Sequence, residues 1–366
     1  MKIISIILMM SITVGCLSCC SGNEEISSLT PPASAKLPIS WQIKSQETVA
    51  SKALIENNKA LQDACVPNSE GTNESIGIWG SYDIDQNGQT FTHTEFEATP
   101  LTYGKKTDDS SNPHNDWNYP GENKYWETGG RYTFRACYPQ KLMEEKMTEI
   151  TPNIIQGPLN TAEVQRDIMV ATAFVNTLNT DLSKPVPLDM MHVFSALKFK
   201  VKAAEGYTPP ANEAVTSCWL QNQTTATDLF TTSGYLVFSG AWGAFTMRWN
   251  KYNATDAPMY RWEHSGVDFT TEKILYTDNN NNTGKEYAQN DGWLLVIPQE
   301  VKENTLHFCY TLKNAGDKVF SLPIPAITYE YGKRYTYMLE ISGASATVTL
   351  SIADWNMLDS SHDINI

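Results

Sequence analysis

The chain has 366 residues, with 27 lysines and arginines against 41 aspartates and glutamates, a formal net charge of −14 and 41% hydrophobic residues. This length is large for a single β-sandwich and suits two domains. The acidic balance excludes a nucleic-acid-binding protein and a polybasic membrane-binding surface, because both need clustered positive charge.

The N-terminus has the pattern of an export signal that ends in cysteines. Lys2 precedes the apolar run 3–14, which has the length of a signal-peptide core and is shorter than the roughly 20 residues of a membrane span. Small residues beside the cysteines that follow resemble a bacterial lipobox. We prefer Cys20 as the acylated residue, because an acidic, polar tether begins directly after it; Cys19 and Cys16 are the alternatives. An ordinary cleaved secretion signal is the other interpretation.

Two features divide the rest of the chain. The Pro- and Asp-rich segment 181–187 is the predicted boundary, and the pattern G-x-R-Y-T-aromatic occurs at both 129–134 and 332–337, as expected for two related domains. Removal of the signal leaves 26 basic residues against 41 acidic ones, because only Lys2 is lost. The predicted units are a signal peptide (1–19), a tether (20–37), an N-terminal β-sandwich domain (38–185) and a C-terminal β-sandwich domain (186–366).

The chain alternates apolar and polar residues in short runs that predict β-strands almost throughout. Asn87-Gly88 lies between two such runs and predicts a tight hairpin turn. The best helix candidates are 53–65 and 141–147. Strands without intervening helices favour an all-β protein of antiparallel sandwiches. The predicted strands are 39–43, 76–79, 82–91, 131–138, 193–201, 215–220, 293–297, 306–312, 335–341 and 346–352, and a surface loop is predicted at 278–284.

Catalytic and metal-binding patterns are scarce, so we predict neither an enzyme nor a cofactor. The sequence lacks HExxH, G-x-S-x-G and P-loop motifs. Asp83, Asp85, Asn87 and Gly88 match the first six positions of an EF-hand Ca²⁺ loop, but position twelve is Thr94, and a hairpin tip explains the same residues. We therefore predict no metal site and keep this segment only as a weak Ca²⁺ candidate.

Other chemistry-bearing residues have structural interpretations. His192 and His264 are isolated, and we predict a structural role for both. The aromatic-rich segment 242–262 could form a sugar-stacking platform, but core packing is favoured. Beyond the signal only four widely spaced cysteines remain, and their three possible pairings stay open: Cys65, Cys137, Cys218 and Cys309.

The sequence contains, in this order, the segments 76–82, 126–139, 167–171, 192–201 with its H-x-h-S-x-h-x-F pattern, 294–299, 332–337 and 352–356. Together these segments resemble fimbrillin-like proteins. The resemblance covers nearly the whole mature chain and implies two transthyretin-like β-sandwich domains and a Bacteroides-type pilus subunit. It also implies an exported lipoprotein precursor at the outer membrane, other pilus subunits as partners, and adhesion to a host or bacterial surface ligand.

The resemblance further implies maturation by a trypsin-like protease that cuts after a basic residue. The matching position is the bond between Lys52 and Ala53, where Lys stands in place of the usual Arg. The strand released would carry Ile39, Trp41 and Ile43. Its groove would then accept a strand from another subunit through main-chain hydrogen bonds and alternate side chains.

The segment near the C-terminus has two interpretations that the sequence leaves open. Val348, Leu350 and Ile352 alternate with polar residues, as in a donated strand or as in an ordinary core strand of its own domain. A permanently lipid-anchored surface protein, either a pilus anchor or a glycan-binding lipoprotein, is the alternative to a stalk or tip subunit. A hydrolase on a β-sandwich scaffold is the third hypothesis, and the sequence offers no starting residue for it.

Overall fold

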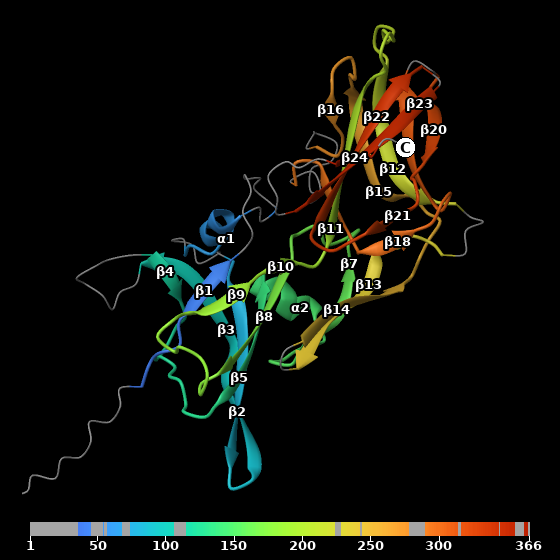
Figure 1. Cartoon of the computed structure of the whole chain (residues 1–366). Coiled ribbons are helices and arrows are strands. Elements are labelled where there is room, and N and C mark those ends of the chain that lie inside the picture. The colour runs from blue at the N-terminus through green and yellow to red at the C-terminus, as the bar shows by residue number, and fades with distance from the viewer. Residues whose placement is uncertain are drawn as a thin grey trace, which may run out of the picture. The chain divides into compact units, whose positions relative to one another are not determined.

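The computed structural model contains a six-stranded antiparallel sheet in the N-terminal half (Figure 1). The structure describes residues 36–44, 54, 57–67, 74–105, 115–223, 228–241, 244–277, 290–313, 316–343, 345–355 and 362–364. In spatial order the sheet comprises β10 (Met191–His192), β8 (Met169–Asn176), β5 (Arg131–Tyr138), β2 (Ile76–Gln86), β3 (Gln89–Lys105) and β4 (Asn115–Asn118).

One face of this sheet packs against a short parallel pair, β1 (Trp41–Lys44) and β9 (Val186–Asp189). Apolar side chains of both layers form one buried cluster, to which the helix α1 (Asn58–Ala64) contributes Leu61. The helix begins where it does because the side chain of Asn57 accepts a hydrogen bond from the Ala60 amide at 2.7 Å.

A second buried cluster lies on side chains that alternate with those of the first along β2 and β5, and therefore on the other face of the sheet. It includes side chains from both predicted domains, because β7 (Ile154–Asn160) precedes residue 185 and its partner β13 (Ser233–Ala241) follows it. Further side chains come from α2 (Gln140–Lys146), β14 (Ala244–Tyr252) and β6 (Glu149–Ile150). Strands β14, β13, β7 and β6 form one sheet in this order. The division at residues 185 and 186 stays a prediction.

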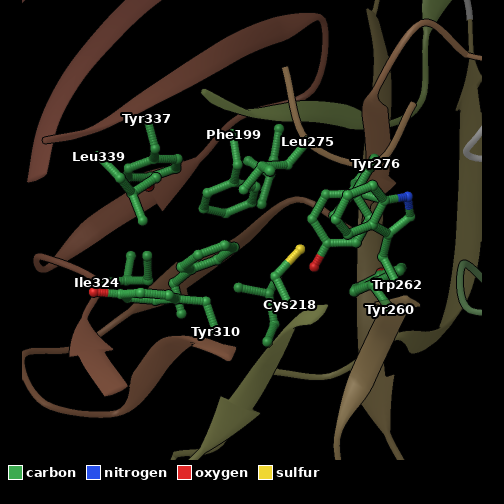
Figure 2. Close-up of a cluster of buried hydrophobic side chains, with 14 of the residues drawn as sticks. Phe199, Cys218, Tyr260, Trp262, Leu275, Tyr276, Tyr310, Ile324, Tyr337 and Leu339 are labelled. Atoms are coloured by element: carbon green, nitrogen blue, oxygen red, sulfur yellow. The ribbon is translucent and has the colours of Figure 1, made fainter. Parts of the chain in front are cut away.

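The C-terminal half is a sandwich of two sheets around an aromatic core (Figure 2). Phe199 stacks between Phe308, at 4.4 Å between ring centroids, and Tyr337, at 5.1 Å. One sheet comprises β16 (Lys273–Ile274), β11 (Ser195–Ala203), β22 (Lys333–Ser342), β23 (Ser345–Asp354) and β24 (His362–Ile364), with β17 (Trp293–Val296) also on β11. The other comprises β15 (Met259–Val267), β12 (Ala214–Asn222), β19 (Leu306–Lys313) and β20 (Lys318–Pro323); β18 (Gln299–Val301) and β21 (Ile327–Tyr329) form a separate pair.

The all-β class predicted from the sequence is confirmed. Strands β5, β12, β19, β22 and β23 lie within two residues of the predicted ranges, while α1 is shorter than the predicted helix. Two parallel pairs, β1 with β9 and β11 with β22, were not expected. Within the described residues no helix has the length and apolarity needed to cross a bilayer.

The repeated G-x-R-Y-T-aromatic pattern has the same local structure at both places. Gly129 and Gly332 have φ angles of 80° and 68°. The Tyr132 hydroxyl accepts the Glu127 amide hydrogen at 2.8 Å, and the Tyr335 hydroxyl accepts that of Glu330 at 2.9 Å. In each case a buried tyrosine ties the start of a strand to the turn before it, so the repeat reflects one local motif used in both halves.

Candidate functional site

Strand β1 is a short edge element whose backbone is held on both sides. On one side the Val186 amide donates to the Ser40 carbonyl and the Met190 amide to the Lys44 carbonyl, both at 2.8 Å. On the other side the Ile39 amide donates to the Lys124 carbonyl at 2.8 Å. The regular ladder covers only four residue pairs, so few main-chain hydrogen bonds hold this strand.

The side chains of β1, and that of Ile39 just before it, are buried far more deeply than the backbone contacts of this segment suggest. Ile39, Trp41 and Ile43 are 2%, 2% and 5% exposed, while Gln42 and Lys44 between and after them are exposed. The ring of Trp41 packs edge-on against Phe96 at 5.3 Å and Phe134 at 5.0 Å. The predicted released strand therefore lies in the structure as an amphipathic edge strand that completes the N-terminal core.

The indole nitrogen of Trp41 is buried without a hydrogen-bond partner among the described residues. An unsatisfied buried donor costs about 1–3 kcal/mol. Strand β1 is thus well packed, but the buried indole N–H of Trp41 has no hydrogen-bond acceptor within the described part of the chain.

A groove of about 540 Å³ lies beside β1. Its lining includes the start of the β1 segment, the β4 residues Asp116–Asn118 and the turn that follows. Polar and aromatic groups share the wall: Trp117 packs on Tyr103 at 5.3 Å, and the Asn118 side-chain amide donates to the Gly104 carbonyl at 3.1 Å. The groove therefore lies beside residues 38–40, which lead into the predicted exchange strand.

The predicted processing sites lie outside the described residues. These are the cleavage position Lys52–Ala53 and the candidate acylated residues Cys20, Cys19 and Cys16. Leu54, two residues after Lys52, is described; it is 1% exposed and belongs to the second buried cluster. The chain is therefore anchored in a core immediately after the predicted cut.

The predicted donor side chains lie on β23 and face the C-terminal core. β23 pairs with β22 over ten residues and with β24 over three. Leu350 is 2% exposed, whereas Val348 and Ile352 are partly buried. The three residues occupy their own sheet here, and their donation to another subunit stays a prediction.

The half-buried side of β23 lines an apolar groove of about 670 Å³. Its opposite wall is the end of β20 and the segment that leads to β21. Phe320 and Leu322 of β20, like Val348 and Ile352, are only partly buried against the core. The C-terminal sandwich is thus less completely covered along this side than elsewhere in its core cluster.

The weak Ca²⁺ candidate is the tip of the β2–β3 hairpin (Figure 1). Asn87 and Gly88 have positive φ angles of 53° and 78°, which confirms the predicted tight turn. Thr92 donates to Asp83 and Thr90 to Asp85, each at 2.6 Å across the strands. Among the described residues no group of three His, Cys, Asp or Glu side chains is arranged to hold a metal ion.

The four cysteines beyond the signal are free and buried: Cys65, Cys137, Cys218 and Cys309. Burial raises the pKa of the Cys65 thiol to about 12, and the Glu74 carboxylate adds to this shift. The pKa of the Cys218 thiol is also raised by burial, and Figure 2 shows this residue among aromatic side chains. These thiols are poor nucleophiles near neutral pH, because the thiolate is the reactive form.

The two histidines singled out from the sequence are packed residues. The His192 ring bonds to Asp167 at 2.9 Å, with both side chains 1% exposed, and stacks on Trp355 at 4.3 Å. His264 stacks on Trp262 at 5.1 Å, and its ring accepts the Gly266 amide hydrogen. The aromatic-rich segment 242–262 contributes core residues too, since Tyr260 is 5% exposed and Trp262 is fully buried.

Sequence reasoning missed β9 as the partner of β1. Val186 and Leu188 are 3% and 0% exposed and alternate with polar or exposed positions. The two prolines at 185 and 187 suggested a linker instead. Pro187 is tolerated because β9 has only β1 as a strand partner among the described elements, so a missing amide costs little there.

Comparison with known proteins gives one family and a common fold. A family model described as fimbrillin-like matches residues 65–355. A fimbrial protein from Bacteroides vulgatus has a similar structure, with a TM-score of 0.54 and 14% identity, over 87% of this chain and 99% of the other. A putative cell adhesion protein from Bacteroides ovatus gives a TM-score of 0.51 and 16% identity, over 89% and 100%. No curated protein matched the sequence.

Proposed function

The chain belongs to the fimbrillin-like family, and from that premise we propose that it is a stalk or tip subunit of a fimbrium, assembled by strand exchange after proteolysis and used for adhesion. The family consists of structural fimbrial proteins, so the chain is not an enzyme, and its partners include other fimbrial subunits at the cell surface. Export as an outer-membrane lipoprotein and cleavage at Lys52–Ala53 belong to the proposal.

The observation that carries the proposal is the contrast within β1. Three alternate side chains are almost fully buried, yet the strand pairs with only four residues of β9. Loss of such a strand opens a groove lined by Phe96 and Phe134, which a strand with the same alternation would fill. The register of the inserted strand is strict, because a shift of one residue would place polar side chains in these pockets.

The proposed donor is the C-terminal strand of another subunit, with Val348, Leu350 and Ile352 as the inserted side chains. The support is their alternation and their place beside a groove, where two of the three are only partly buried in their own domain. The lipid on Cys20 is proposed to hold the precursor at the outer membrane until a trypsin-like protease cuts it.

A second candidate function is a permanently lipid-anchored surface protein, either a pilus anchor or a glycan-binding lipoprotein. The observation in its favour is the deep burial of Trp41, which makes the uncut chain complete without exchange. Mass spectrometry of the native protein distinguishes the two: an acylated cysteine still joined to residues 40–52 supports the permanent anchor.

The direct test uses the precursor without residues 1–19 and limited trypsin digestion. We expect a single early cut between Lys52 and Ala53, followed by SDS-resistant ladders on a gel. The matched control is Lys52→Gln, which should stay uncut at this bond and monomeric. Cut protein that remains monomeric at high concentration would contradict strand exchange.

A further inference from the structure

Trp355 follows β23 immediately, and its side chain is completely buried. Its backbone amide donates to the Gly332 carbonyl at 2.8 Å, which ties the end of β23 to the turn before β22. Its side chain belongs to the second buried cluster, the one that also contains side chains of β2, β5 and β8. The residue directly after β23 thus reaches a core shared with the N-terminal sheet.

His192 joins Trp355 to that sheet by a ring stack. The two rings stack with 4.3 Å between centroids and an angle of 14° between planes. His192 lies on β10, which pairs with β8, and its ring is fixed by the bond to the buried carboxylate of Asp167. The stacking partner of Trp355 is therefore held in place by contacts of its own with Asp167 and with β8 of the N-terminal sheet.

A cation adds to the grip on Trp355. The Arg334 guanidinium lies 5.5 Å from the ring centroid of Trp355 and 5.1 Å from that of Trp293. Guanidinium groups at this distance attract aromatic rings, most strongly where water is excluded. Arg334 comes from β22 and Trp293 from β17. Together with β10, which carries His192, three elements of the chain thus meet at the end of β23.

The rest of β23 is held less deeply. Ala346, Val348 and Ile352 are only partly buried and line the open apolar groove, and Leu350 alone is 2% exposed. The strand beyond it, β24, pairs with β23 over three residues. Among the described side chains of residues 345–355, burial is therefore concentrated at Leu350 and, above all, at Trp355.

We propose that Trp355 is a positioning residue that latches the C-terminal strand onto its own subunit and sets the rate at which that strand is released. The proposal rests on the donor role of β23 stated above. Withdrawal of Trp355 must break the His192 stack, the Arg334 contact and the Gly332 hydrogen bond together. Once it has left, the partly buried remainder of β23 opens more easily.

Hydrogen–deuterium exchange of the uncut chain without residues 1–19 tests the latch without any assembly step. In Trp355→Ala we expect the β23 amides to exchange roughly 150-fold faster or more, the factor that corresponds to the lower end of core truncations of tryptophan. The β2 and β5 amides should stay within threefold of the wild type. Trp355→Phe keeps a ring against His192 and should show a smaller acceleration.

The control is Trp262→Ala, which removes another fully buried tryptophan of the C-terminal sandwich, on β15. It should accelerate exchange across the sandwich without selecting β23. Equal acceleration in the N-terminal sheet and β23 of Trp355→Ala, or none in either, would overturn the latch and leave Trp355 an ordinary core residue.

Assembly after limited trypsin digestion separates this proposal from the proposed function. Faster ladder formation by Trp355→Phe than by the wild type supports the latch. Equal rates overturn it as a control on assembly and leave the fimbrial function intact. If the wild type forms no ladders while β23 exchange is selectively accelerated, strand exchange is wrong and Trp355 still holds the strand.

Discussion

Truncation of Trp41 tests whether β1 is held mainly by its side chains. In Trp41→Ala the two edge-on contacts with Phe96 and Phe134 are lost and a cavity remains in the N-terminal core. Core truncations of large aromatic residues cost about 3–5 kcal/mol. Removal of the unpaired indole N–H recovers roughly 1 kcal/mol, so we expect a net loss of about 3 kcal/mol in the free energy of unfolding.

Urea denaturation of the chain without residues 1–19, followed by tryptophan-independent circular dichroism, measures this loss. The matched control is Gln42→Ala on the same strand, which is exposed and should change stability by less than about 0.5 kcal/mol. Trp41→Phe keeps a ring in the pocket and removes the unpaired donor, so it should cost clearly less than Trp41→Ala. A loss below about 1 kcal/mol in Trp41→Ala would refute the packing argument, given the range for such truncations.

The same variant has a second readout once the chain is cut after Lys52. The released segment then stays bound only by non-covalent contacts, and a loss of 3 kcal/mol corresponds to roughly 150-fold weaker retention. Native mass spectrometry of cut protein should therefore show faster loss of the 20–52 segment in Trp41→Ala than in the wild type. Equal retention would mean that the β1 backbone, rather than Trp41, holds the segment.

Three further predictions concern stability. Gly157→Ala should lower the free energy of unfolding by more than about 2 kcal/mol in urea denaturation, because an added Cβ would lie 2.5 Å from the Met147 Cα. The control, Gly121→Ala, has open space at its Cβ and should cost about 1 kcal/mol for its positive φ alone. Tyr335→Phe should cost about 1–3 kcal/mol in the same assay, because the Glu330 amide loses its acceptor. Stability should fall as pH rises from about 9 toward 12, because burial raises the pKa of Cys65 to about 12 and the thiol of the unfolded chain loses its proton at lower pH. In alkaline denaturation curves Cys65→Ala should therefore show a shallower decline of stability than the wild type.

Local patterns predicted most of the strands because the apolar residues that fill each core alternate. Val215–Leu220 and Leu306–Leu312 became β12 and β19, which pair directly. The strands 233–252 were missed, because glycine, serine and alanine at 239–241 and 243–244 weaken any alternation. The pairing of β13 with β7 is set by tertiary packing, which no short window of sequence contains.

The candidate site was predicted only in part, for a physical reason. The alternation of Ile39, Trp41 and Ile43 correctly indicated a strand with one buried face. Its partner, β9, lies more than 140 residues away, and parallel pairing between distant segments leaves no local signal. The proposed role of Trp355 depends on His192, which lies on β10 of the N-terminal sheet, so no local window of sequence contains both residues.

The two strands proposed to exchange differ in what would have to be broken to free them. β1 gives up a ladder of four pairs but three deeply buried side chains, whereas β23 gives up ten pairs with β22 and fewer deeply buried ones. Main-chain hydrogen bonds can be replaced by hydrogen bonds to water at small net cost, whereas the exposure of buried apolar side chains to water is not compensated in this way. We therefore expect the free energy gained when a new strand fills the groove left by β1 to exceed the free energy lost when β23 leaves its sheet. This holds once Trp355 has been withdrawn. Processing that removes β1 would thus create the acceptor, while the hold on Trp355 would keep the donor in place until that acceptor is available.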